Sequence, residues 1–142
     1  MIVSQAIKET AEKLGALYLR AVPSEANETI ERHDLQGRFL VIYTNHPTVD
    51  YDITGGFTKA NYPVQIQVLK LGDFDDNTED SDILVDECRA FAETMALALL
   101  NYEEGIIFPD GFETDPFDTV QIYDSILTGV TLTLDINFQL VC

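Results

Sequence analysis

The chain has 142 residues, of which 25 are Asp or Glu and 8 are Lys or Arg, so its formal net charge is −17. Binding to the phosphate backbone of nucleic acid requires clustered Lys and Arg side chains, and the eight cations here are scattered along the sequence. We therefore expect no nucleic-acid binding, whether general or sequence-specific, and no adhesion to anionic lipid. The length, together with a hydrophobic content of 46%, predicts a single domain over residues 1–142 with one core.

The high acidity is compatible with four interpretations that the sequence leaves open. It can serve solubility or salt adaptation, or it can attract a basic protein partner. It can also mimic DNA, or line a pore through which DNA passes without binding. These interpretations differ in their partners, and residue chemistry alone does not choose among them.

No segment of the sequence approaches the roughly 18 consecutive apolar residues that a membrane-spanning helix requires. Residues 1–13 carry charges every few positions and lack the apolar stretch of a signal peptide. We therefore expect no membrane association and a chain that stays in the cytoplasm where it is made. The two cysteines, Cys88 and Cys142, do not make a disulfide framework, so we expect a reducing compartment.

The first predicted element is a helix over residues 4–21, because apolar residues recur at helical spacing between charged ones. Ser4 is expected to cap its N-terminus, and Pro23 is expected to stop it. The apolar stripe of this helix consists of Ile7, Ala11, Leu14 and Tyr18.

Two strands are predicted in the next part of the chain. Residues 38–44 form a short run that is rich in β-branched and aromatic side chains, which favours a strand. Residues 45–61 contain a proline and two adjacent glycines and are predicted to form a long irregular connection. Residues 62–71 alternate apolar and polar side chains, which is typical of a strand with one buried face.

An acidic loop at residues 73–82 is predicted to lead into a second helix over residues 81–102, whose apolar face includes Cys88. Acidic residues near a helix N-terminus are favourable because of the helix dipole. Two strands are then predicted, over residues 118–123 and 130–141. The last strand has the clearest alternation in the chain. It would span roughly 40 Å at about 3.3 Å per residue, long enough to invite packing against a neighbouring subunit.

The element order α-β-β-α-β-β predicts an α+β fold in which two helices cover one face of an antiparallel four-stranded sheet. The opposite face is predicted to be polar, and therefore either solvated or in contact with another subunit. It carries Gln65, Gln67, Thr131, Thr133 and Asn137. The three residues of the last strand among these, Thr131, Thr133 and Asn137, are candidate interaction residues.

The acidic loop supplies the other candidate interaction residues, which are Asp73, Asp75, Asp76, Glu79, Asp80 and Asp82. Its start, D-x-D-x-N, imitates a calcium-binding EF-hand loop. The sixth position, however, holds Thr78 where a glycine is needed, and the twelfth holds Leu84 where a bidentate glutamate is needed. Specific Ca²⁺ binding is therefore disfavoured. The loop is interpreted either as a solvated helix cap or as a docking surface for a basic partner.

Catalytic and metal-binding patterns are weak in this sequence. His46 lies near Asp50 and Asp52, a combination that can bind a metal or transfer protons, but no further His or Cys joins them at ligand spacing. A small enzyme or metal-binding domain built on these three residues is the least favoured hypothesis. His33 lies in a polar stretch, and the sequence contains neither G-x-S-x-G nor G-x-x-x-x-G-K. We therefore expect no enzyme activity, no cofactor and no metal site.

Three stretches of the second half carry a resemblance to a known family. Residues 63–69 form a predicted strand that runs into the acidic loop, and residues 83–92 form the helix that follows. Near the C-terminus, residues 126–134 contain the pattern L-x-G-V-x-L-x-L of a closing strand, as Leu127-Thr128-Gly129-Val130-Thr131-Leu132-Thr133-Leu134. Over residues 62–142 the chain resembles small phage tail-terminator and tail-completion (neck) proteins.

The resemblance implies a mixed α/β subunit that forms a homo-oligomeric ring, often a hexamer, at the head-proximal end of a tail or in the neck of the virion. It implies contacts with other tail or neck proteins, assembly in the host cytoplasm, and no catalytic residues. Our first hypothesis is such a virion structural protein, in which loops at residues 45–61 and 105–116 meet neighbours. The alternative is an acidic protein-binding module, an inhibitor or DNA mimic, that depends on Asp75, Asp76 and Glu79.

Overall fold

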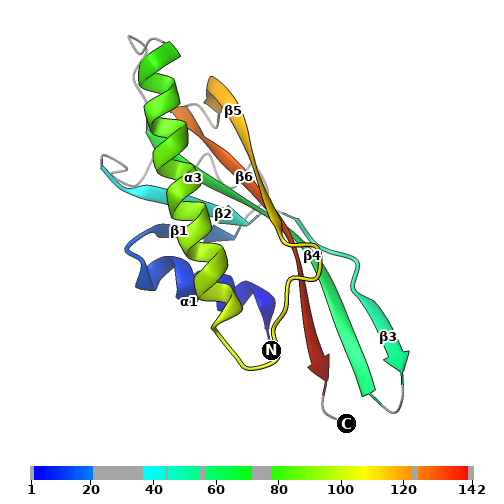
Figure 1. Cartoon of the computed structure of the whole chain (residues 1–142). Coiled ribbons are helices and arrows are strands. Elements are labelled where there is room, and N and C mark those ends of the chain that lie inside the picture. The colour runs from blue at the N-terminus through cyan, green and yellow to red at the C-terminus, as the bar shows by residue number, and fades with distance from the viewer. Residues whose placement is uncertain are drawn as a thin grey trace.

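The computed structural model describes residues 2–20, 37–43, 45–54, 57–71, 78–122 and 125–140 (Figure 1). Two helices are present in this part of the chain, α1 (Val3–Lys13) and α3 (Thr78–Leu100). The strands are β1 (Leu17–Arg20), β2 (Phe39–Tyr43), β3 (Asp50–Thr54), β4 (Phe57–Leu71), β5 (Phe112–Ile122) and β6 (Ser125–Leu140). Among the described residues, no helix is long and apolar enough to cross a membrane.

The six strands form one mixed sheet. The strand order is β1-β2-β4-β6-β5, and β3 also pairs with β4. β1 runs parallel to β2, whereas the other described strand pairs are antiparallel. The predicted α+β class is confirmed. The predicted antiparallel four-stranded sheet and the order α-β-β-α-β-β are wrong, because β1 and β3 add two strands.

α1 ends at Lys13, much earlier than the predicted helix. Gly15 has a positive φ of 86°, a conformation that residues with a side chain rarely adopt. Around it the Gly15 N–H donates to the Glu12 carbonyl and the Ala16 N–H donates to the Ala11 carbonyl, each at 3.0 Å, which is the Schellman arrangement that ends helices. The chain then extends and pairs with β2, so Tyr18 lies in a strand and not on the predicted helix stripe.

The helix boundaries correct two further predictions. Ile2 occupies the N-cap position of α1 without a side-chain cap, and Ser4 lies inside the helix. α3 begins at Thr78, so residues 78–82 belong to the helix and not to the predicted acidic loop. Just beyond α3, the Tyr102 hydroxyl donates a hydrogen bond to Glu9 of α1, and this bond lowers the pKa of the Glu9 carboxyl.

β2 and β3 both pair with the same edge of β4, because β6 occupies the other edge. β2 covers residues 66–70 of β4 and β3 covers residues 57–61. Between them the Asn45 amide takes the place of a strand. Its Nδ2 donates to the Pro63 carbonyl at 3.1 Å, and its Oδ1 accepts from the Gln65 N–H at 3.1 Å. The connection that was predicted to be irregular therefore contains β3 and the start of β4.

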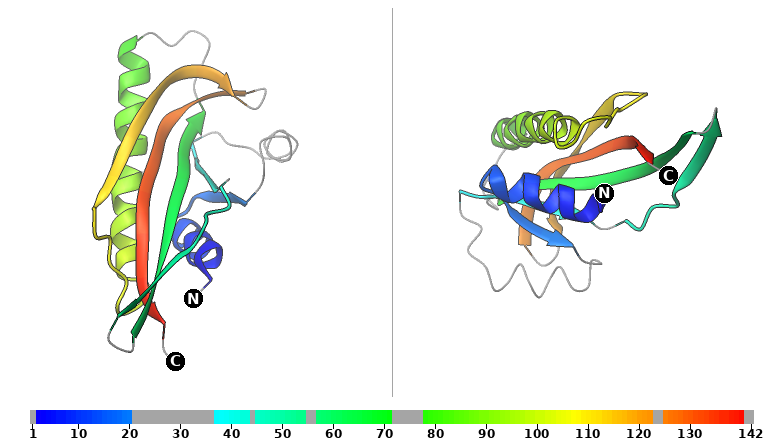
Figure 2. Two further views of the ribbon diagram at one scale, coloured as in Figure 1. Left: turned by 90° about the vertical axis from the view of Figure 1, so that its right-hand side faces the viewer. Right: turned by 90° about the horizontal axis from the view of Figure 1, so that it is seen from below.

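The core lies between the helices and one face of the sheet, and both described helices cover that face (Figures 1 and 2). The alternation predicted in β4 and β6 places their apolar side chains there, where they are buried. α3 contributes the stripe that includes Cys88, as predicted. The central core residues are Ile7, Ala11, Val41, Val64, Ile66, Val68, Cys88, Ala92, Met95, Val130, Leu132 and Leu134.

The opposite face of the sheet is divided into an apolar half and a polar half. On the β1–β2 side, Leu40, Ile42 and Leu69 alternate with core residues and are fully buried. The prediction of a wholly polar face is therefore wrong for this half. On the β4–β6 side the face is polar, with Gln65 exposed and Gln67 half-buried. Sequence alternation alone does not distinguish these halves, because β2 is apolar at every position and so carries no alternation.

β4 and β6 form the longest ladder of the sheet, from Thr58 paired with Leu140 to Leu71 paired with Leu127. Gly129 lies inside this ladder opposite Leu69. A Cβ added at Gly129 would lie 2.0 Å from the Val68 carbonyl oxygen, so the close approach of the two backbones requires glycine at this position. On the other side of β6, β5 carries a bulge between Phe117 and Val120.

Candidate interaction surfaces

The structure describes only part of the acidic candidates. Asp73, Asp75 and Asp76 fall outside the described residues. Glu79, Asp80 and Asp82 belong to the first turns of α3, and the Asp80 and Asp82 side chains are exposed. Negative charge at this end of a helix is stabilised by the exposed N–H groups of the first turn. The position of these three acids near the N-terminus of α3 is therefore favourable for the helix itself.

The polar candidates Thr131, Thr133 and Asn137 lie on β6 and face away from the helices, where they are half-buried. They therefore belong to a different surface from the acids of α3. The ladder places Thr131 opposite Gln67 and Thr133 opposite Gln65, as the predicted polar face requires.

A pair of asparagines marks one end of this polar face. Asn137 pairs with Asn61 of β4 across the ladder. Within the described part of the chain, the Oδ1 atoms of both side chains are buried and accept no hydrogen bond. Buried acceptors without a donor cost about 1–3 kcal/mol each. The pair lies at the base of the projecting feature described next.

Three strands project beyond the helices as an arm, which consists of β3, residues 57–62 of β4 and residues 136–140 of β6 (Figures 1 and 2). At its base the rings of Tyr62 and Phe138 stack with centroids 5.4 Å apart. Further out, Tyr51 and Ile53 of β3 remain 59% and 76% exposed. Within the described residues β3 pairs with β4 alone, so its outer edge is open. The arm was not predicted, because its first strand, β3, falls in the segment 45–61 that was predicted to be irregular.

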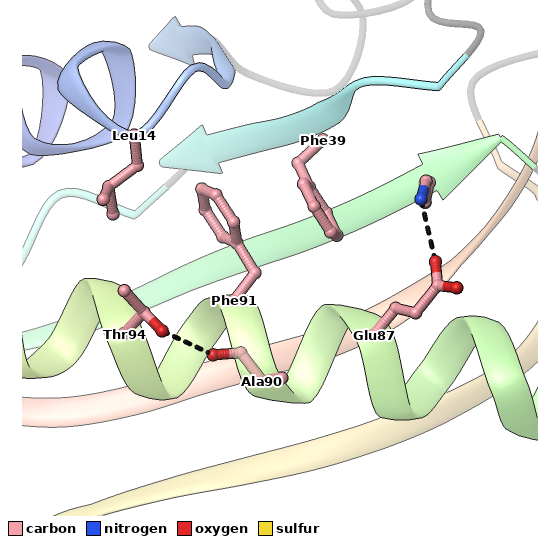
Figure 3. Close-up of a pocket in the computed structure, with 7 residues that line it drawn as sticks. Leu14, Phe39, Glu87, Ala90, Phe91 and Thr94 are labelled. Carbon is pink, nitrogen blue, oxygen red and sulfur yellow. Dashed lines mark hydrogen bonds and ion pairs between the residues drawn. The ribbon is translucent and has the colours of Figure 1, made fainter.

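A pocket of about 470 Å³ opens between α3, β2 and the end of α1 (Figure 3). Its apolar wall is a stack of Phe39 on Phe91, with ring centroids 4.4 Å apart, and Leu14 closes one end. At the other end Lys70 Nζ lies 2.8 Å from Glu87 Oε2 and 4.9 Å from the centre of the Phe39 ring. The pocket thus offers an aromatic surface beside one ion pair. No sequence motif predicted this pocket, because the residues that line it come from four separate parts of the chain.

His46, the centre of the weakest hypothesis, is engaged by a cation. The Arg20 guanidinium donates to the Tyr43 carbonyl at 2.7 Å and to the Asn45 carbonyl at 2.8 Å, and it lies 3.0 Å from His46 Nδ1. Arg has no acceptor, so Nδ1 accepts this bond and faces a positive charge. Asp50 and Asp52 lie on β3 of the arm. Among the described residues, no group of three or more His, Cys, Asp or Glu side chains is placed to hold a metal ion.

Cys88 is a core residue with no access to solvent. Burial raises the pKa of its thiol to about 12, and its Sγ donates to the Thr128 carbonyl at 3.6 Å. A thiol with so high a pKa is a poor nucleophile at neutral pH.

A scan against models of known protein families finds no match, and a search of curated proteins finds none either. The surfaces above therefore rest on the residues and geometry of this chain.

Proposed function

We propose that this chain is a structural subunit that assembles with copies of itself into a ring, at the head-proximal end of a bacteriophage tail or in the neck of the virion. The main observation in support of self-assembly is the arm. It leaves two large apolar side chains exposed beside an open strand edge. Large apolar side chains that lie exposed together are typical of association surfaces. The exposed Asp50 and Asp52 of the same strand disfavour uncontrolled pairing at its edge, so the support comes from Tyr51 and Ile53.

The placement in a virion is supported by the resemblance of residues 62–142 to tail-terminator and neck proteins. In that setting the expected ring is a hexamer, its partners are other tail or neck proteins, and assembly takes place in the host cytoplasm. The net charge of −17 suits a ring through which DNA passes without binding. The proposal assigns the chain no catalytic residue and no cofactor.

The sign of the salt dependence separates this function from an acidic module that binds a basic protein. Copies of a chain with a charge of −17 repel each other, so salt that screens this repulsion strengthens self-association through apolar contacts. Association with a basic partner is attractive and weakens with salt.

The test is the solution mass by light scattering over a concentration series, at about 0.01 M and about 1 M salt, where the Debye length falls from roughly 30 Å to roughly 3 Å. We expect a ring-sized oligomer that is favoured by high salt. Ile53→Asp is expected to shift the mass towards the monomer. Ile83→Asp, at a side chain of α3 that is 53% exposed, is the matched control and should leave the mass unchanged. A monomer under every condition would refute the proposal.

A further inference from the structure

We draw no further inference here: the strongest candidate, the pocket between α3, β2 and the end of α1 whose wall is the Phe39–Phe91 stack, is largely open to solvent, and nothing in the structure shows what covers it.

Discussion

Replacing Gly129 with Ala probes the tightest backbone contact in the sheet. The added Cβ would lie 2.0 Å from the Val68 carbonyl oxygen, 2.9 Å from the Val68 carbonyl carbon and 3.0 Å from Leu69 Cα, all of them backbone atoms. Ordinary contacts of this kind begin at about 3.4 Å. The φ of Gly129 is not in the left-handed region, so the substitution acts through space alone. Relief requires β4 and β6 to separate locally by more than about 1 Å.

The cost of that separation follows from the ladder. A backbone hydrogen bond near 2.9 Å that lengthens by more than 1 Å is lost. Each ladder bond contributes about 0.5–1.5 kcal/mol, and each buried group left without a partner costs about 1–3 kcal/mol. With two or three such groups affected beside buried Val68 and Thr128, we expect Gly129→Ala to lower the free energy of unfolding by about 3–5 kcal/mol. This is a large part of the roughly 5–15 kcal/mol that stabilises a domain.

Urea denaturation followed by circular dichroism measures the effect as a change in the free energy of unfolding. Thr133→Ala is the matched control, since it lies on the same strand, faces away from the helices and should cost less than about 1 kcal/mol. A Gly129→Ala protein that unfolds within about 1 kcal/mol of the unsubstituted chain would show that β4 and β6 do not approach as closely as described. The steric reasoning would then be refuted.

Asn45→Ala is expected to lower the free energy of unfolding by about 1 kcal/mol, because the Pro63 carbonyl and the Gln65 N–H lose a hydrogen-bond partner but remain near solvent. Urea denaturation measures this change, and an unchanged midpoint would contradict the prediction. Stability should also fall at alkaline pH. Burial raises the pKa of Tyr18 and of Cys88 to about 12 from ordinary values of 10.0 and 9.0, so the stability they contribute is present below about pH 9 and is lost as the pH rises towards 12. Tyr18→Phe should flatten this loss in urea midpoints taken across that range, and an identical pH profile would show that ionisation of Tyr18 does not contribute to the loss.

Local sequence patterns predicted some residues of the candidate surfaces and missed others. The polar residues of β6 were placed correctly on one face, because alternation is a local property of a strand. The acids of α3 were recognised, but their separation from that face depends on which side of the sheet the helix covers. The pocket was missed because Leu14, Phe39 and Phe91 come from distant parts of the chain. The arm had a detectable signal, the alternation of Tyr51 and Ile53 with acidic neighbours, but aspartate is unfavourable in strands and obscured it.

By itself, the sequence determined the features that arise within one element: the long α3, the buried and exposed sides of β4 and β6, and the acidity that governs long-range electrostatics. Tertiary structure alone decided the features that depend on pairing between distant segments. The sequence of residues 17–20 is compatible with either a helix or a strand. In the structure they form a strand, because the turn at Gly15 ends α1 and residues 17–20 pair in parallel with β2. From the sequence alone, Gly129 is interpreted as a turn residue. The structure shows that glycine is needed there because the backbone of β4, about 60 residues away in the chain, approaches it closely.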